Sequence, residues 1–199
     1  MPGYTGQAPN GFTDRAKGRG ITSSGWYTQI GSGGAISAGG GNIYSFLSVA
    51  GVANGADTTA DTIASVVIPA RTFDVVGRCI TVQAWGNVTA TSATKTVSFS
   101  FGASLTQSIV QYTTTNTGQW QAWIQLFKTG TNTQMALFQA DANGTTASLL
   151  GLSGGRALNI STAGTETDTA AITMKITGQS SVATAGLVTC QGFIVDGFN

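Results

Sequence analysis

Residues 96–102, TVSFSFG, indicate most directly how this protein folds. Val97, Phe99 and Phe101 alternate with threonine and serine, so an extended chain places three apolar side chains on one face and the hydroxyl groups on the other. The stretch ITVQAW, residues 80–85, has the same period of two. Each stretch predicts a strand that buries one face and exposes the other.

The same alternation recurs along most of the chain after residue 43. KTGTN, residues 128–132, supplies a glycine-containing hairpin turn, and no segment has a convincing helical period. About eight to ten short strands separated by turns predict an all-β antiparallel sandwich, and a jelly-roll-like sandwich is favoured because the chain lacks the Cys-Trp-Cys spacing of immunoglobulin domains. The further runs that predict strands are 44–52, 61–68, 107–112, 120–130, 132–141, 156–161, 171–178 and 187–195.

The composition is that of a surface rich in hydroxyl groups and poor in charge. Charged residues make up 9% of the 199 residues, whereas average soluble domains have about 25%. The net charge of +1 gives no overall field that would attract nucleic acid or an anionic membrane. We therefore expect neither as a partner. The basic cluster of Arg15, Lys17 and Arg19 lacks interleaved aromatic residues, which favours an acidic protein surface or solvent over phosphate groups.

The first part of the chain differs from the rest. Of the 28 glycines, 14 lie in residues 1–55, and GSGGAISAGGG at 31–41 is too glycine-rich to hold regular structure alone. We expect residues 1–42 to form an extended N-terminal arm and residues 43–199 to form the sandwich. No apolar segment follows a basic start, so no secretory signal is expected. The arm's candidate protein-binding residues are Phe12, Arg15, Lys17, Arg19, Ile21, Trp26 and Tyr27.

The sequence argues against most enzymatic chemistry. The chain has no histidine, which removes Ser-His-Asp and Cys-His catalysis and the usual zinc sites. It has no phosphate-binding GxxxxGK[ST] loop, and we expect no cofactor. Lys95, Lys128 and Lys175 occupy strand or hairpin positions, where we expect solvated charges that point outward.

Two carboxylate pairs have a catalytic or metal-binding alternative. Glu166, the only glutamate, and Asp168 are spaced to share a face of a strand, and glycoside hydrolysis needs only two suitably placed carboxylates. Their setting between threonines favours a hydrogen-bonding cap at the start of a strand. Asp57 and Asp61 form a weaker metal hypothesis, because the surrounding residues offer few oxygen ligands. We therefore expect no metal site and no enzymatic activity.

Tryptophans and cysteines leave further alternatives open. Trp120 and Trp123 are three residues apart in a predicted strand and must point to opposite faces, so at least one of the two rings can lie away from the core. An outward ring could contact sugar or protein, or belong to a second packed layer or a subunit interface. Trp85 and Phe127 are also on strands. Cys79 and Cys190 lie in apolar runs and are expected to be buried free thiols, although a disulfide between them remains possible.

Several segments resemble those of jelly-roll structural proteins of tailed-bacteriophage virions, particularly capsid decoration or cement proteins. The resemblance covers about residues 44–199 and is carried by strand and turn patterns. The segments, in order, are IPARTF (68–73), ITVQAWG (80–86), TKTVSFSFG (94–102), KTGTNTQ (128–134) and TETDTAAITMKITG (165–178).

This resemblance implies a non-enzymatic protein on the capsid surface of the virion, made in the cytoplasm of the bacterial host. It implies binding to the major capsid protein, assembly as a homo-oligomer, with a trimer favoured, and an arm that reaches across neighbouring subunits. Similar domains also occur in tail parts. The alternative is therefore a tail-fibre, tailspike or other tail-associated module that binds host surface glycan.

Overall fold

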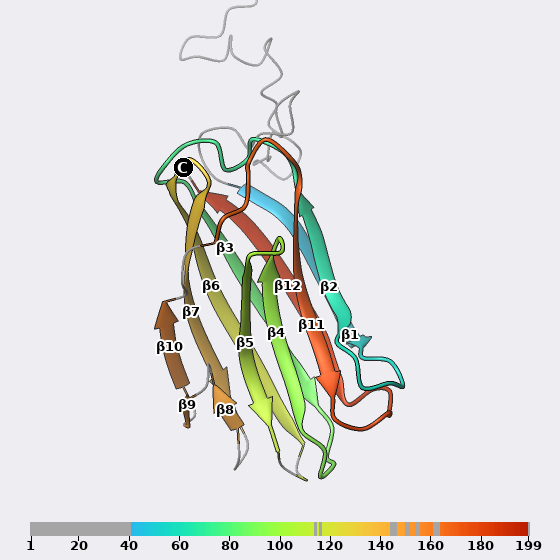
Figure 1. Ribbon diagram of the computed structural model, residues 1–199. Helices are drawn as coiled ribbons and strands as arrows, with labels where there is room; N and C mark the ends of the chain where they lie inside the picture. Colours follow the sequence, from blue (N-terminus) through green and yellow to red (C-terminus); the bar gives the residue numbers. More distant parts are fainter. Residues whose placement is uncertain are drawn as a thin grey trace, which may run out of the picture.

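The computed structural model consists of β-strands in two layers (Figure 1). It describes residues 41–198 apart from positions 114, 116, 144–146, 150–151, 154–155 and 161–163. No helix occurs among these residues, and this part of the chain therefore has no helix that could cross a membrane. The strands are β1 (Gly41–Ala53), β2 (Asp61–Ile68), β3 (Cys79–Val88), β4 (Lys95–Phe101), β5 (Leu105–Tyr112), β6 (Gly118–Gly130), β7 (Thr133–Ala142), β8 (Ala147–Leu149), β9 (Leu152–Ser153), β10 (Arg156–Ile160), β11 (Ile172–Ser180) and β12 (Val188–Phe198).

The strand order is that of a jelly roll. One sheet has the order β1-β12-β3-β6-β7-β10 and the other β2-β11-β4-β5-β8-β9, and all the neighbouring strands are antiparallel. If β7 to β10 are set aside, the remaining eight strands pair as β1 with β12, β2 with β11, β3 with β6 and β4 with β5. This nested pairing is that of a double Greek key. The predicted jelly-roll-like antiparallel sandwich is therefore confirmed. Strands β7 to β10 extend both sheets.

The core lies between the two sheets and is built from the inward residues of the alternating runs. Val97, Phe99 and Phe101 are fully buried, as the period of two in TVSFSFG predicts. Phe99 packs edge-on against Phe138 of the opposite sheet, with 5.7 Å between the ring centroids. Phe101 packs against Phe73 with 5.9 Å between the ring centroids. Aromatic side chains from β4 therefore connect the two layers.

The predicted strands are found close to their predicted positions, and the structure adds two. The run 61–68 coincides with β2, and the KTGTN turn joins β6 and β7 as a hairpin. Strands β8 and β9, residues 147–149 and 152–153, were not predicted. A strand of two or three residues is too short to display a period of two, so this part of the sheet is revealed only by the pairing of β8 with β5 and of β9 with β8.

Strand β1 is an edge strand with a protruding bulge. Leu47 is opposite Gly192 and Val52 is opposite Cys190, so the residues between Leu47 and Val52 are accommodated in the bulge. A hydrogen bond holds the bulge against β12: the Gln191 side chain donates to the Val49 carbonyl at 2.7 Å. Leu47 and Val49 are 77% and 94% exposed. The edge therefore presents apolar side chains to solvent on an ordered turn of chain.

Of the arm predicted for residues 1–42, residues 1–40 lie outside the described residues. The described chain begins with β1 at Gly41, two residues before the predicted start of the sandwich. All the arm's candidate protein-binding residues also lie outside the described part: Phe12, Arg15, Lys17, Arg19, Ile21, Trp26 and Tyr27.

Both cysteines are free thiols, which excludes the disulfide alternative. Cys190 is buried in β12, where its thiol donates to the Gly192 carbonyl at 3.3 Å, and burial raises the pKa of this thiol to about 12. Cys79 is half-buried at the start of β3. Burial also raises the pKa of Cys79, although a hydrogen bond with Thr81 opposes the shift. Neither thiol has the lowered pKa of a reactive cysteine.

Candidate functional site

Glu166 is a structural cap on the turn between β4 and β5. Its Oε1 atom accepts hydrogen bonds from the backbone N–H of Ala103 at 2.7 Å and of Ser104 at 2.6 Å. The turn passes through Gly102 with φ of 61°, and a Cβ atom there would lie 2.0 Å from Cδ of Glu166. Only glycine fits this position, because the backbone is left-handed and the carboxylate lies directly against it. Glu166 is a hydrogen-bonding cap, but it caps the turn between β4 and β5, whereas the sequence predicted a cap at the start of its own strand.

The main chain around Glu166 is clamped to β7. The Gln134 side chain accepts from the Glu166 N–H at 3.0 Å and donates to the Glu166 carbonyl at 2.7 Å. Gln134 also forms a two-way backbone bridge with Gly164, with N···O distances of 3.0 and 2.6 Å. Gln134 is fully buried. The segment that crosses from one sheet to the other is therefore fixed at the end of the sandwich.

The hydrogen bonds of Glu166 change its titration. Burial acts to raise the pKa of the carboxyl, but bonds from the hydroxyl and N–H of Ser104 and from the N–H of Ala103 together outweigh it, and the pKa lies below its ordinary value of 4.5. A carboxyl whose pKa is lower in the folded chain stabilises the fold above the unfolded pKa and loses that contribution as the pH falls through the folded pKa. Glu166 therefore stabilises the folded protein at neutral pH, and this contribution is lost in acid.

The Glu166→Gln variant tests this contribution. We expect the free energy of unfolding to fall by about 1 kcal/mol at pH 7, because a neutral amide accepts these two bonds more weakly than a carboxylate and solvent screens part of the difference. At a pH below the folded pKa the wild-type carboxyl is protonated, and the two proteins should unfold at nearly the same urea concentration. An equal loss of stability at both pH values would show that the charge of Glu166 is not the cause.

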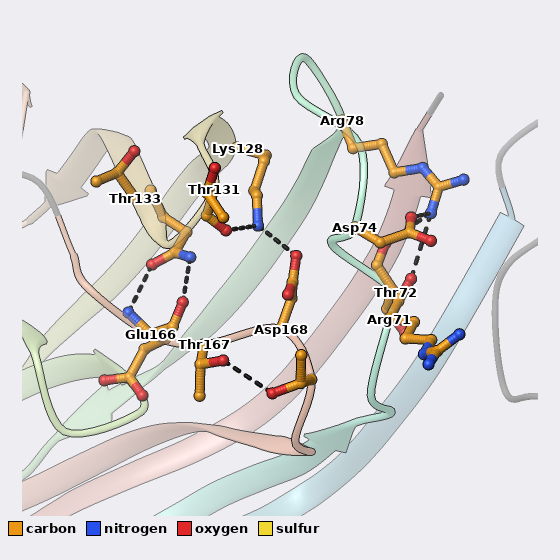
Figure 2. A network of polar contacts seen from close by, with 12 residues as sticks. Arg71, Thr72, Asp74, Arg78, Lys128, Thr131, Thr133, Glu166, Thr167 and Asp168 are labelled. Atoms are coloured by element: carbon orange, nitrogen blue, oxygen red, sulfur yellow. Dashed lines mark hydrogen bonds and ion pairs between the residues drawn. The ribbon is translucent and has the colours of Figure 1, made fainter.

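Asp168 forms a buried ion pair with Lys128 at the end of β6. The ammonium of Lys128 also donates to the Thr131 carbonyl. Figure 2 shows the Asp168 carboxylate facing Lys128, whereas the Glu166 carboxylate points away from both. The backbone oxygen of Asp168 accepts from the N–H of Arg71 at 2.7 Å. Glu166 and Asp168 therefore serve different partners and do not converge on one substrate position.

The expectation that the lysines are solvated is wrong for two of the three. Lys95 is fully buried and Lys128 is 2% exposed. The ammonium of Lys95 donates to the Thr91 carbonyl at 2.7 Å, and burial lowers the pKa of Lys95. Both lysines are in phase with the buried residues of their strands, so the strand period overrides the usual preference of lysine for water. Lys175 is half-buried.

The second carboxylate pair also has local structural roles. Asp57 accepts from the N–H and hydroxyl of Thr59 at 2.8 and 2.7 Å, and these bonds lower the pKa of Asp57. Asp61 accepts from the N–H of Gly55 at 2.7 Å. Each aspartate closes its own turn. Within the described ranges, no group of three or more carboxylate, cysteine or histidine side chains could hold a metal ion.

The tryptophans divide between the core and the surface as predicted. Trp120 is 2% exposed and donates from its indole N–H to the Thr189 carbonyl at 3.2 Å. Trp123 is 41% exposed on the outer face of the same strand. Trp85 of β3 is half-buried on that outer face. The sheet formed by β3, β6 and β7 therefore carries two indole rings on the side that faces away from the core.

Trp85 lies against the neighbouring strand at a glycine. A Cβ atom on Gly192 of β12 would lie 2.0 Å from Cζ2, 2.2 Å from Cε2 and 2.5 Å from Cη2 of Trp85. The absence of a side chain at Gly192 thus leaves the space that the indole occupies. This contact holds the ring of Trp85 down against the sheet.

Two adjoining hollows surround these indole rings. A hollow of about 410 Å³ and another of about 260 Å³ share Trp85, Gln121 and Asp141 as lining residues. Gln121 donates to the Asp141 carboxylate at 3.0 Å. We call the two hollows together the outer-sheet groove. Its other side-chain amides are those of Gln83, Asn87, Gln119, Gln139, Asn143 and Gln191, and Trp123 lies beside them.

Strand register brings the groove together. Trp85 is opposite Gln121, and Gln83 is opposite Trp123, in the antiparallel pair of β3 and β6. The tripeptide Gln-Ala-Trp occurs in both strands, at 83–85 and 121–123. Antiparallel pairing of the two copies produces a crossed arrangement of tryptophan and glutamine on one face. The tryptophans were candidates from the sequence but the amides were not, and the repeated tripeptide is the signal that could have identified them.

Comparison with known protein families, with curated proteins and with solved structures finds no match to this chain.

Proposed function

We propose that this protein is a non-enzymatic structural component of a tailed-bacteriophage virion, and most specifically a capsid decoration or cement protein. It binds the major capsid protein on the outer surface of the shell and acts as a homo-oligomer, with a trimer favoured. The observation that carries the proposal is the nested jelly-roll strand order, which is an architecture of viral capsid proteins and of lectins.

The two candidate carboxylate pairs support a role without catalysis. Glu166, Asp168, Asp57 and Asp61 each hold a turn or a neighbouring element through hydrogen bonds. A glycosidase needs two carboxyl groups on opposite sides of one scissile bond, and Glu166 and Asp168 point to different partners. We infer that the protein contributes binding and stability to an assembly, with no cofactor.

The exposed edge of the sandwich suits contacts with other subunits. Leu47 and Val49 are exposed at the bulge of β1, and Val52 of the same strand is 42% exposed. Large exposed apolar side chains grouped on ordered chain are typical of protein-binding surfaces. The predicted arm, residues 1–42, precedes this edge directly in the sequence.

The test is co-sedimentation of the purified full chain with undecorated shells of the phage that encodes it. We expect the full chain to pellet with the shells, and deletion of residues 1–40 to weaken binding by about tenfold or more, which corresponds to about 1.4 kcal/mol. Circular dichroism and urea unfolding of the truncated chain serve as the control that its sandwich is folded. Undiminished binding of the truncated chain would remove the proposed role of the arm, and failure of the full chain to bind shells would contradict decoration.

A tail-associated module that binds host surface glycan is the second candidate, and the outer-sheet groove is the observation that favours it. Fractionation of disrupted virions separates the two functions. Recovery of the protein with the shells supports decoration, whereas recovery with the tail supports the second candidate.

A further inference from the structure

We propose that the outer-sheet groove binds an extended, neutral carbohydrate chain, with Trp85 and Trp123 as stacking surfaces. The inference deepens the glycan-binding candidate by assigning the site and the class of ligand. It requires only that the groove be accessible, and it therefore applies to a protein on the shell as well as to one on the tail.

The first argument is the arrangement of the aromatic rings. Trp85 and Trp123 stand on adjacent strands in a diagonal relation, since each is directly opposite a glutamine. The C–H groups on the face of a sugar ring are weakly positive and apolar, which matches the negative face of an indole. Trp85 is already held against Gly192, so little side-chain freedom would be lost on binding. Two indoles on one face can contact two positions of one chain.

The second argument is the polar lining. A side-chain amide both donates and accepts hydrogen bonds, as a sugar hydroxyl does, and several such amides line the groove together with the indoles. The described lining residues include one carboxylate, Asp141, and no cation. A phosphate or an acidic sugar would meet that carboxylate without a compensating charge among these residues. The lining therefore favours a neutral ligand rich in hydroxyl groups.

The third argument is the shape of the site. A further hollow of about 540 Å³ shares Asn87, Gln119, Asn143 and Gln191 with the hollow at Trp85, and residues Val49 and Ala50 of the β1 bulge form part of its lining. The three hollows follow one another along the paired strands β3 and β6, from Gln83 and Trp123 at one end to Thr89 and Thr117 at the other. A row of adjoining hollows suits a chain of several sugar units better than a single enclosed molecule.

The experiment uses the full chain on an array of neutral and acidic oligosaccharides, followed by calorimetric titration with the neutral hexasaccharide that gives the strongest signal. We expect binding to at least one neutral hexasaccharide and a dissociation constant about tenfold or more higher for its monosaccharide unit, because one unit cannot reach both indoles. The Trp85→Ala and Trp123→Ala variants should each weaken hexasaccharide binding by about tenfold or more.

Two further variants identify the cause of any loss. Gly192→Ala should weaken binding while keeping both tryptophans, because a Cβ atom there displaces the indole of Trp85. Val67→Ala, at an exposed position on the other sheet, should leave binding unchanged. Circular dichroism establishes that each variant is folded, and Trp123→Ala, which removes an exposed side chain, keeps the test decisive if Gly192→Ala does not fold.

Three results would overturn the inference. They are the absence of binding to every neutral oligosaccharide, stronger binding of acidic oligosaccharides, and hexasaccharide binding that is unaffected in both tryptophan variants. If the tryptophan variants instead change the molecular mass of the assembly without any sugar binding, the groove is a contact between subunits. Shell binding of the Trp123→Ala variant is measured in parallel, so failure of carbohydrate binding can be distinguished from failure of capsid decoration.

Discussion

Replacement of Asp168 by asparagine is expected to lower the free energy of unfolding by about 3–5 kcal/mol, which is the usual cost of removing one member of a buried ion pair. The Lys128 side chain is 1% exposed and that of Asp168 is 15% exposed. Without the carboxylate, the ammonium of Lys128 keeps the Thr131 carbonyl as a partner but loses its counter-charge. Urea unfolding at pH 7, followed by tryptophan fluorescence, measures the difference.

A neighbouring ion pair provides the matched control. Arg78 and Asp74 also form an ion pair at this end of the sandwich (Figure 2), but their side chains are 21% and 44% exposed. Asp74→Asn should therefore cost about 1 kcal/mol or less, since water already screens this pair. Adding Lys128→Met to the Asp168→Asn variant should recover part of the lost stability by removing the unpaired charge. Equal costs for Asp168→Asn and Asp74→Asn would mean that burial of the first pair contributes nothing.

Replacement of Phe99 by alanine is expected to lower the free energy of unfolding by about 3–5 kcal/mol. The ring of Phe99 is fully buried and packs edge-on against Phe138 across the two sheets. Its removal loses the burial of an aromatic side chain and leaves a cavity that the strands of both sheets can close only in part. The same urea experiment measures the effect, and the slope of the transition should remain that of a cooperative unfolding.

Val49→Ala is the control for this second prediction. Val49 is 94% exposed, so its truncation should change the free energy of unfolding by about 0.5 kcal/mol or less. A small effect of Phe99→Ala, comparable with that of Val49→Ala, would contradict the assignment of β4 to the centre of the core. A normal effect of Phe99→Ala with a large effect of Val49→Ala would instead mean that the β1 bulge is packed against another subunit in solution.

The fold class could be predicted because its signal is local. Alternation of apolar and polar residues follows from the geometry of an extended chain, in which successive side chains point to opposite faces. Val97, Phe99 and Phe101 therefore indicated the buried face of β4 without any knowledge of its neighbours. The same reasoning separated Trp120 from Trp123.

The alternation of inward and outward residues also predicts that Lys95 and Lys128 point into the core, but it does not explain how a charged group is tolerated there. Lys128 follows Leu126 in the inward phase of β6, and Lys95 precedes Val97 in the inward phase of β4. The preference of lysine for water argued against those positions. What makes burial tolerable for Lys128 is Asp168, which is forty residues away along the chain and reaches it from the crossover between the sheets. No local pattern contains that information.

The sequence alone predicted an all-β sandwich and the residues that alternate into its core, and it contains no histidine. Which strands are neighbours became clear only from the assembled sheets. That arrangement turns two separate Gln-Ala-Trp stretches into one groove, and it assigns Glu166 and Asp168 to different structural partners. The physical reason is that the direction of a side chain depends on its own stretch of backbone, whereas a site depends on contacts between residues far apart in the chain, and these arise only when the sheets assemble.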